Sequence, residues 1–270
     1  HPKVNPYRKN ITEVQNLGKY CYYLEHLNII LGAYRRISND ELTKELNKKI
    51  SLHLLENSLR YDNFHADLLP YVKMKWPADQ AAILYSLWLY DKNNQTDISS
   101  DLISKWFRYM DAKETHSKTG LYHTEVLKTR KYSNQPRGCS MSYMIHYIGK
   151  FAPKRGKEKW EIYKHHMLKS SMGLYGFREY LPDFKSKWNP DSGPIINGVG
   201  IAATGLGLNA ASTVGDKETF NKINNSLNKF YKIGINIEYL IGPSKLTSIG
   251  TDLLSSSIWL NAETKIKWYP

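Results

Sequence analysis

The sequence predicts an all-α protein built from helical hairpins. Apolar residues recur at steps of three and four through most of the 270 residues, the spacing of helices that bury one face. The connections between the expected helices alternate between tight turns and long segments, as in stacked helical hairpins. Short runs such as 173–181 have the composition of strands, but they are too few for a large sheet.

Nine helices are expected, and the spacing of apolar residues in each span is the reason for predicting it. The expected spans are 11–36, 40–59, 78–91, 97–112, 139–152, 156–172, 196–214, 216–233 and 245–261. The first has a broad apolar stripe that includes Val14, Cys21 and Leu24. The fourth repeats the pattern, and the sixth does so more loosely. We expect one domain over residues 1–270, which is long enough for a large core.

The lengths of the connections suggest where a site lies. Tight turns follow the first, third, fifth and seventh helices, whereas long segments of roughly 60–77, 113–138, 173–195 and 234–244 follow the others. If the hairpins run up and down, every long loop lies at one end of the bundle. Because function concentrates on loops carried by a rigid scaffold, that rim is the expected site.

The segment Trp188 to Asp216 is unusual, because a polar loop runs directly into a helix of small and apolar residues. Such a helix must be buried, so the loop before it is held in place. Asp191 is expected near the start of this helix, beside Ser192 and the Gly193-Pro194 turn. Its carboxylate is therefore either a helix cap or part of a site.

Composition and charge exclude several classes of binding partner and of structural feature. The formal charge is +13, but lysines are scattered and interleaved with glutamates at helical spacing, so we expect no nucleic-acid partner. The longest small-residue run, 197–213, is too short for a membrane span. Two cysteines exclude a disulfide scaffold, although one bridge stays open. The glycines after 198 lack the strand of a dinucleotide loop, and we expect no cofactor and no metal.

Aromatic content is high, with 20 Tyr and 7 Trp. These side chains suit a surface that grips a partly apolar, partly hydroxylated molecule, although the genome's base composition explains the same surplus. The sequence begins at His1 and shows no signal peptide. We expect export to the periplasm or the medium rather than a cytoplasmic location. The sequence leaves the oligomeric state open.

Three local strings resemble those of a known superfamily. They are Trp76-Pro77-Ala78-Asp79, Thr119-Gly120-Leu121-Tyr122-His123 and Asp191-Ser192-Gly193-Pro194. With the hairpin pattern, they resemble α/α-toroid proteins, the six-hairpin glycosidase-like superfamily, and among these the bacterial linalool dehydratase-isomerase-like group. The resemblance covers about residues 60–215 and implies a ring of hairpins with its site on the long-loop rim. Nine helices where a full ring has twelve imply an incomplete toroid.

Five side chains are the candidates for catalysis. Asp79, Cys139 and Asp191 stand at the beginnings of odd-numbered helices, which run the same way in the hairpin arrangement and so meet at one rim. Glu125 and Glu179 come from the long loops of that rim. Neighbours can push carboxyl pKa values apart and create an acid and a base. The expected substrate-binding residues are Trp76, Tyr122, His123, Arg137, Tyr175, Arg178 and Trp188.

Each candidate also has a structural explanation. Asp79 and Asp191 suit helix N-termini, where acidic side chains cap the helix or oppose its dipole. Glu179 and Glu125 suit ion pairs with nearby arginine or lysine. Cys139 is either a thiol activated by a helix N-terminus and Arg137 or an inert, buried side chain. His146 reads as a core histidine, and the adjacent pair His165-His166 lacks the spacing of a zinc site.

Three functions follow from these patterns. The first is a glycoside hydrolase or polysaccharide lyase with rim carboxylates as general acid and base. The second is a dehydratase-type lyase or isomerase for a small hydroxylated or isoprenoid substrate, with Asp79, Cys139 and a tyrosine sharing the proton transfers. The third is a non-catalytic toroid that binds a glycan or a protein. An open groove lined by carboxylates favours the first, and an enclosed pocket beside a thiol favours the second.

Overall fold

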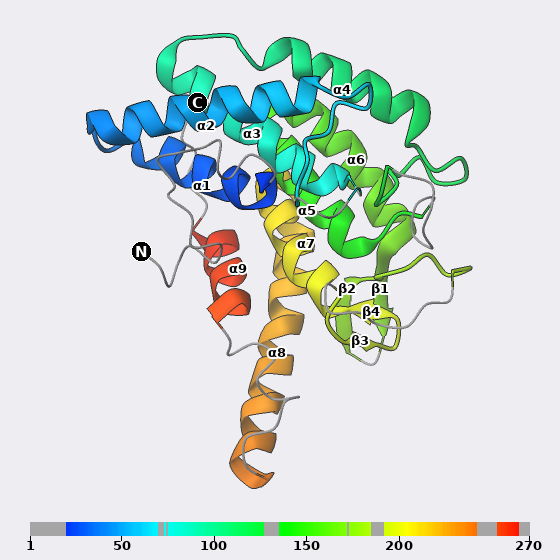
Figure 1. Ribbon diagram of the computed structural model, residues 1–270. Helices are drawn as coiled ribbons and strands as arrows, with labels where there is room; N and C mark the ends of the chain where they lie inside the picture. Colours follow the sequence, from blue (N-terminus) through cyan, green and yellow to red (C-terminus); the bar gives the residue numbers. More distant parts are fainter. Residues whose placement is uncertain are drawn as a thin grey trace. The chain divides into compact units, whose positions relative to one another are not determined.

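The computed structural model is mostly helical with a few short strands, as the sequence predicts (Figure 1). It describes residues 20–69, 73, 75–126, 135–171, 173–184, 192–241 and 253–264, with the backbone alone for 230–241 and 253–255. The chain divides into two compact units, one formed by 1–115 and 122–135 and the other by 116–121 and 136–270. A single domain and an incomplete toroid of hairpins therefore stay predictions.

The first unit contains four of the helices. They are α1 (Cys21–Tyr34), α2 (Glu41–Leu59), α3 (Pro77–Asn94) and α4 (Ser100–Lys113). The α3 helix is rich in Ala and Leu, is buried along most of its length, and packs against the other three. Asp40 is the N-cap residue of α2, and its carboxylate accepts the backbone N–H of Thr43 at 2.7 Å.

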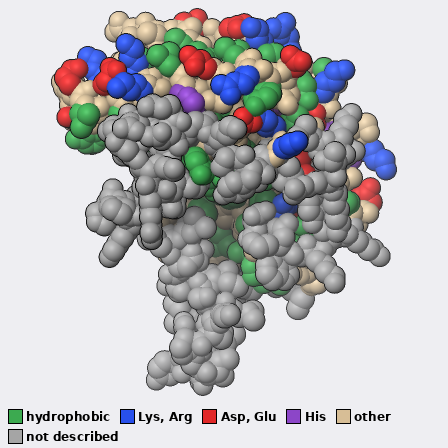
Figure 2. All heavy atoms as spheres, viewed as in Figure 1, with side chains coloured by type: hydrophobic (Ala, Val, Ile, Leu, Met, Phe, Trp, Pro, Cys, Tyr) green, Lys and Arg blue, Asp and Glu red, His purple; other side chains and the backbone are tan. Residues whose placement is uncertain are grey.

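Charged side chains cover the outer helices of the first unit. Figure 2 shows Lys and Arg interspersed with Asp and Glu on the face it presents. Along α2, Lys44 pairs with Glu41 and Lys49 with Glu45, at helical spacing. Among the coloured side chains of this face, positive and negative charges alternate, and Lys and Arg are not gathered into one patch.

The second unit surrounds a helix of small residues. Its elements are α5 (Gly138–Phe151), α6 (Pro153–Met167), β1 (Leu168–Ser171), β2 (Leu174–Phe177), β3 (Ile195–Ile196), β4 (Val199–Gly200), α7 (Ile201–Val214), α8 (Lys217–Ile241) and α9 (Leu253–Glu263). The α7 helix contacts α5, α6, α8, α9 and β2. Its small side chains allow these close approaches, so the expectation that this helix is buried is confirmed.

Consecutive helices contact each other within each unit, although the most extensive contacts are between alternate helices, α1 with α3 and α5 with α7. Within the first unit, α1 contacts α2 and α3 contacts α4; within the second, α5 contacts α6 and α7 contacts α8. The turn between α7 and α8 contains Gly215 at φ 81°, a conformation that favours glycine. Two antiparallel pairs, β1–β2 and β3–β4, form the sheets of the described residues.

Within the described residues, three expected helix boundaries are wrong by five residues or more, and a strand pair replaces helix at two of them. The third is the end of the helix expected over 216–233, because α8 continues to Ile241, into the segment expected to be a long loop over 234–244. The helix expected over 196–214 begins only at Ile201, because Asn197 and Gly198 adopt positive φ angles of 52° and 81° and join β3 to β4. Two consecutive residues in this conformation form the tight turn of a hairpin. The helix expected over 156–172 ends at Met167, where β1 begins.

Candidate functional site

The chain brings three of the predicted site residues together in the second unit. Arg137 and Cys139 flank the first residue of α5, and Glu179 lies shortly after β2. Gly138 permits this approach, because a Cβ at that position would collide with the carbonyl oxygen of Arg178. The backbone N–H of Gly138 instead donates to the carbonyl of Glu179 at 2.9 Å.

Glu179 is the centre of this cluster. Its Oε1 accepts hydrogen bonds from Nε of Arg137 at 2.8 Å and from Sγ of Cys139 at 3.0 Å. Its Oε2 accepts the backbone N–H of Cys139 at 3.2 Å. The carboxylate thus caps α5 from a distant part of the chain and also contacts the thiol. We call Arg137, Cys139 and Glu179 the thiol–carboxylate cluster.

Burial controls the electrostatics of the cluster. Glu179 is 0% exposed, Arg137 is 4% exposed and Cys139 is 8% exposed. Burial raises the pKa of Glu179 above its usual range, while Arg137 and the hydrogen bonds from Cys139 oppose that rise. Burial lowers the pKa of Arg137, but the charges of Cys139 and Glu179 outweigh it and raise that pKa overall. The guanidinium therefore stays charged.

This arrangement suits proton transfer. Glu179 is in hydrogen-bonding contact with the thiol, so it can accept the proton of Cys139. The resulting thiolate would lie beside the Arg137 guanidinium and at the N-terminus of α5, both of which stabilise negative charge. The interpretation of Glu179 as an ion-pair partner is therefore compatible with a role for the same carboxylate in chemistry.

A tyrosine lies deep in the core near this cluster. The Tyr163 hydroxyl is within 2.8 Å of Oγ of Ser142 and 3.0 Å from the carbonyl oxygen of Gly138. Burial raises its pKa well above the usual range, and the charges of Glu179 and Cys139 add to this effect. Tyr163 therefore stays a neutral phenol that supports the first turn of α5.

In the first unit, Asp79 lies in the first turn of α3 and pairs with a carboxyl group that the sequence analysis missed. Glu25, on α1, is 0% exposed. Burial raises its pKa well above 4.5, and the charge of Asp79 raises the pKa further. The Glu25 carboxyl group therefore keeps its proton to a higher pH than a free carboxyl group does. The N-cap position of α3 is occupied by Trp76, another predicted residue, and not by Asp79.

The predicted residues of the 113–138 loop lie among buried polar groups of the first unit. Tyr122 is fully buried, and its hydroxyl donates to Asp111 at 2.6 Å. The ring of His123 lies 3.2 Å from Glu114, which also accepts the hydroxyl of Tyr109 at 2.9 Å. Glu125 is 5% exposed. These side chains hold the loop against the helices of the unit, and their part in binding or catalysis stays a prediction.

The remaining predicted residues are dispersed. Tyr175 lies on β2, where the ammonium group of Lys222 is 5.6 Å from the centre of its ring. Arg178 follows β2 and lines a separate pocket. Asp191 and Trp188 lie outside the described residues. The N-cap position of the helix that Asp191 was expected to begin is occupied by Gly200.

The sequence predicts a core histidine at His146 and leaves open whether the two cysteines form a disulfide bridge. Nδ1 of His146 lies 2.8 Å from the hydroxyl of Thr213 and 3.3 Å from a backbone oxygen of α7, so this histidine is bonded to its neighbours as expected, although it is half-buried and not in the core. Cys21 and Cys139 are both buried thiols. Three pocket histidines, His116, His165 and His166, were missed as a group.

Comparison with known proteins gives a likeness in fold. No family model and no curated protein matches the chain. The crystal structure of a sugar epimerase from a ruminal bacterium matches with a TM-score of 0.53 and 14% sequence identity, over 93% of this chain and 75% of that chain. In the described residues, no helix is long and apolar enough to cross a membrane, and no three His, Cys, Asp or Glu side chains are placed to hold a metal. The chain therefore shares a mostly helical fold with a sugar-processing enzyme.

Proposed function

We propose that this chain is an enzyme that acts on a carbohydrate or a similar small hydroxylated molecule, with Cys139 and Glu179 as the proton-transfer pair. The observation that carries the proposal is the 3.0 Å hydrogen bond from the Cys139 thiol to a buried carboxylate held by Arg137. The fold it shares with a sugar epimerase is consistent with this substrate class. The reaction class that fits best is isomerisation or elimination.

The proposed chemistry begins with the thiol proton. Glu179 accepts that proton, and Arg137 stabilises the thiolate. The thiolate then removes a proton from a substrate carbon next to a carbonyl group. The electron pair of the broken C–H bond forms a carbon–carbon double bond, and the π pair of the carbonyl group moves onto its oxygen. Returning a proton to the same carbon from the other side, or to a neighbouring atom, gives an isomer. Loss of a hydroxide leaving group instead gives a dehydrated product.

Proton exchange with solvent tests this proposal without knowledge of the product. The protein is incubated in D₂O with reducing mono- and disaccharides, and with a hydroxylated isoprenoid, and exchange is followed by proton NMR. We expect deuterium at the carbon beside the carbonyl, and a loss of roughly a hundredfold or more in Cys139→Ser and Glu179→Gln. Cys21→Ser is the matched control, because Cys21 is a buried thiol outside the cluster. Equal exchange by Cys139→Ser and Cys21→Ser would overturn the assignment.

A second candidate is hydrolysis or β-elimination of a glycan with Asp79 as the acid. The observation that favours it is the pairing of Asp79 with Glu25, which keeps a proton in a carboxyl pair. Glycosidases need two carboxyl groups about 5–10 Å apart that act separately, so a pair that is coupled through one proton can supply only one of the two roles. Release of reducing ends from polysaccharides, lost in Asp79→Asn and kept in Cys139→Ser, would select this reaction over isomerisation.

A further inference from the structure

A serine in the first turn of α5 has a hydroxyl group without a partner. Ser140 follows Cys139 and is 9% exposed. Its Oγ is buried and, among the described residues, makes no hydrogen bond. The hydroxyl of Ser142, on the same helix, instead contacts Tyr163 and donates to the carbonyl oxygen of Ala203. Because a buried polar group without a partner costs free energy, the position of Ser140 needs a specific reason.

The backbone N–H of Ser140 is also without an acceptor. The first four N–H groups of an α-helix have no acceptor within the helix itself. In α5, the two residues directly before Ser140 donate theirs to Glu179, and Met141 donates to the carbonyl of Arg137. In the part of the chain that the structure describes, no atom accepts the N–H of Ser140. One residue therefore holds two unused hydrogen-bond donors at the start of this helix.

Ser140 and Cys139 border the part-exposed face of α5. Successive residues of an α-helix are about 100° apart around its axis, so Tyr143, one turn further on, projects between the two. Tyr143, His146 and Tyr147 are partly exposed, whereas most other side chains of the helix are buried. The ring of Tyr147 stands edge to face with those of Tyr143 and His146, with centres 4.9 Å apart in each pair. The serine and the thiol thus lie at the N-terminal end of an aromatic face.

The electrostatics of this end of α5 favour an oxygen that carries negative charge. Side chains of an α-helix tilt towards its N-terminus, so the Ser140 hydroxyl lies over the first turn. The helix dipole is positive there. Arg137, held by Glu179 at the same end, adds a full positive charge. A hydroxyl group, a backbone N–H and two positive electrostatic contributions therefore coincide beside Cys139.

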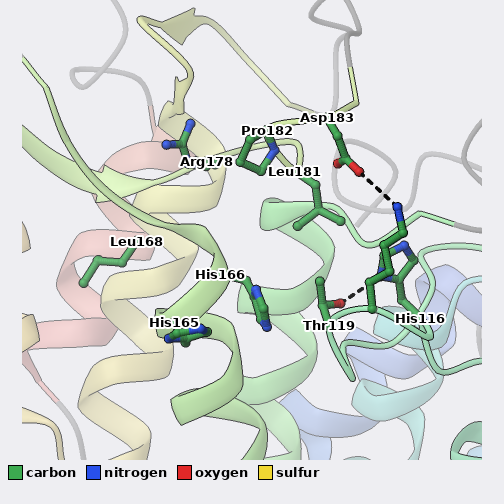
Figure 3. Close-up of a pocket in the computed structure, with 10 residues that line it drawn as sticks. His116, Thr119, His165, His166, Leu168, Arg178, Leu181, Pro182 and Asp183 are labelled. Carbon is green, nitrogen blue, oxygen red and sulfur yellow. Dashed lines mark hydrogen bonds and ion pairs between the residues drawn. The ribbon is translucent and has the colours of Figure 1, made fainter.

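The open pocket of about 390 Å³ near the end of α6 offers no comparable set of donors (Figure 3). His116, His165, His166 and Arg178 are among its lining residues. The Arg178 guanidinium lies at one end and is turned away from His116. The Thr119 hydroxyl is already engaged, at 2.9 Å from Nδ1 of His116. These groups do not converge, so they do not form a site for a single oxygen atom.

We propose that the hydroxyl and the backbone N–H of Ser140 form an oxyanion hole that binds the carbonyl oxygen of the substrate. This inference rests on the proposed function, in which Cys139 removes a proton from the carbon beside that carbonyl group. As the C–H bond breaks, negative charge develops on the oxygen, and Ser140 donates hydrogen bonds to it without giving up a proton. Preorganised donors of this kind stabilise the transition state more than the ground state. The substrate is then an aldehyde or a ketone, such as the open-chain form of a sugar.

Ser140→Ala separates this role from a structural one. Because the hydroxyl has no partner, its removal should leave Tm unchanged or raise it. In the D₂O exchange assay, kcat should fall roughly a hundredfold while KM stays unchanged, since the lost interaction forms in the transition state. Ser58→Ala is the matched control, because the hydroxyl of this buried helical serine donates to Leu54 and accepts from Gln80. It should lower Tm and leave kcat unchanged.

Binding of a hydroxamate tests the site without turnover. The hydroxamate of glycolic acid has the planar shape and the adjacent oxygens of an enolate. In isothermal titration calorimetry of the full chain with EDTA present, we expect it to bind the wild type and to bind Ser140→Ala roughly tenfold or more weakly. His166→Gln changes the pocket near α6 and should bind the hydroxamate as the wild type does. Weakening by His166→Gln equal to that by Ser140→Ala would place the ligand elsewhere and overturn the assignment.

The two measurements distinguish failure of the oxyanion hole from failure of the proposed function. If the wild type exchanges deuterium and Ser140→Ala does so with the same kcat, the oxyanion hole is overturned and the proposed function stands. If no sugar exchanges but hydroxamate affinity depends on Ser140, the site for an oxygen anion is supported and the proposed reaction is contradicted. Equal hydroxamate affinity in the wild type and Ser140→Ala overturns the oxyanion hole. A loss of Tm in Ser140→Ala as large as that in Ser58→Ala would assign the hydroxyl a structural role instead.

Discussion

The thiol of Cys139 lies 3.0 Å from Oε1 of Glu179, and the same oxygen accepts the hydrogen bond of a buried arginine. The two residues are far apart in the sequence and meet because the chain returns after β2 to the first turn of α5. Glu179 therefore has two functions, one as the cap of a helix and one as the partner of a thiol. Stability and activity must be measured separately to distinguish them.

Glu179→Gln is expected to lower the free energy of unfolding by roughly 3 kcal/mol, because it leaves the buried guanidinium of Arg137 without a counter-charge. Urea unfolding at pH 7 measures this loss. Glu218→Gln is the control, since Glu218 pairs with Lys222 on the exposed face of α8, and it should change the free energy by less than about 1 kcal/mol. Equal losses in the two variants would contradict the structural role of the buried pair.

The free energy of unfolding should depend on pH because Glu25, beside Asp79 in the first unit, keeps its proton in the folded chain. Burial, followed by the charge of Asp79, raises the pKa of Glu25 well above 4.5 in the folded chain. Below pH 4.5, Glu25 is protonated in both the folded and the unfolded chain, so its contribution to stability is fully present. As the pH rises towards the folded-state pKa, the unfolded chain releases the proton and the folded chain keeps it. Stability is therefore lost, by up to about 1.4 kcal/mol per pH unit.

Urea unfolding of the wild type and Glu25→Gln between pH 4.5 and pH 8.5 measures this effect. We expect the wild type to lose stability relative to the variant as the pH rises, because glutamine cannot ionise. Parallel profiles for the two proteins would show that Glu25 does not hold a proton in the folded chain. The same experiment with Asp79→Asn asks whether the neighbouring carboxyl group causes part of the shift.

The general architecture could be predicted from residue patterns because its causes are local. Helical spacing of apolar residues identified the helices, and the composition of the 201–214 segment showed that this helix is buried. Cys139 was expected at a helix start, and it lies in the first turn of α5. The hairpin at Asn197-Gly198 was missed, although that dipeptide is a known turn signal, because the apolar residues around it also continue a helical pattern.

The site depends on contacts that no local pattern contains. Nothing near Glu179 in the sequence shows that its partner is Arg137 and not the adjacent Arg178. Glu25 was missed as the partner of Asp79, although a carboxyl residue directly after Leu24 on an apolar helix face is a detectable sign of a buried charge. Residue type and loop length can therefore nominate a site, but tertiary packing decides which side chains meet.

Alkylation of the native protein should distinguish the two thiols. Cys21 is 0% exposed, and burial, followed by the charge of Glu25, raises its pKa to about 12. Cys139 is 8% exposed and lies beside Arg137. With iodoacetamide at pH 8, we expect Cys139 to be modified at least tenfold faster than Cys21, measured by mass spectrometry of peptides. Equal rates in the folded protein, with both thiols reactive in urea, would remove Cys139 as an activated thiol.

Two glycines of α7 provide a matched test of how the buried helix is packed. Alanine in place of glycine favours a helix by roughly 0.5–1 kcal/mol. Among the described residues, a Cβ at Gly205 would meet Ile258 alone, at 3.9 Å, so Gly205→Ala should stabilise the protein. At Gly207 it would lie 2.5 Å and 2.7 Å from ring atoms of Phe177, which is stacked on Tyr163 and cannot move away.

Gly207→Ala is therefore expected to lower the free energy of unfolding by about 1–2 kcal/mol, since the cost of overpacking exceeds the gain in helix propensity. Because Phe177 precedes the segment that carries Glu179, the same variant should also slow any exchange that depends on the thiol–carboxylate cluster. Urea unfolding and the D₂O assay measure the two effects on one pair of variants. Stabilisation by both substitutions would show that β2 shifts to make room for the added methyl group on α7. The contact between Gly207 and Phe177 would then not fix the position of Glu179.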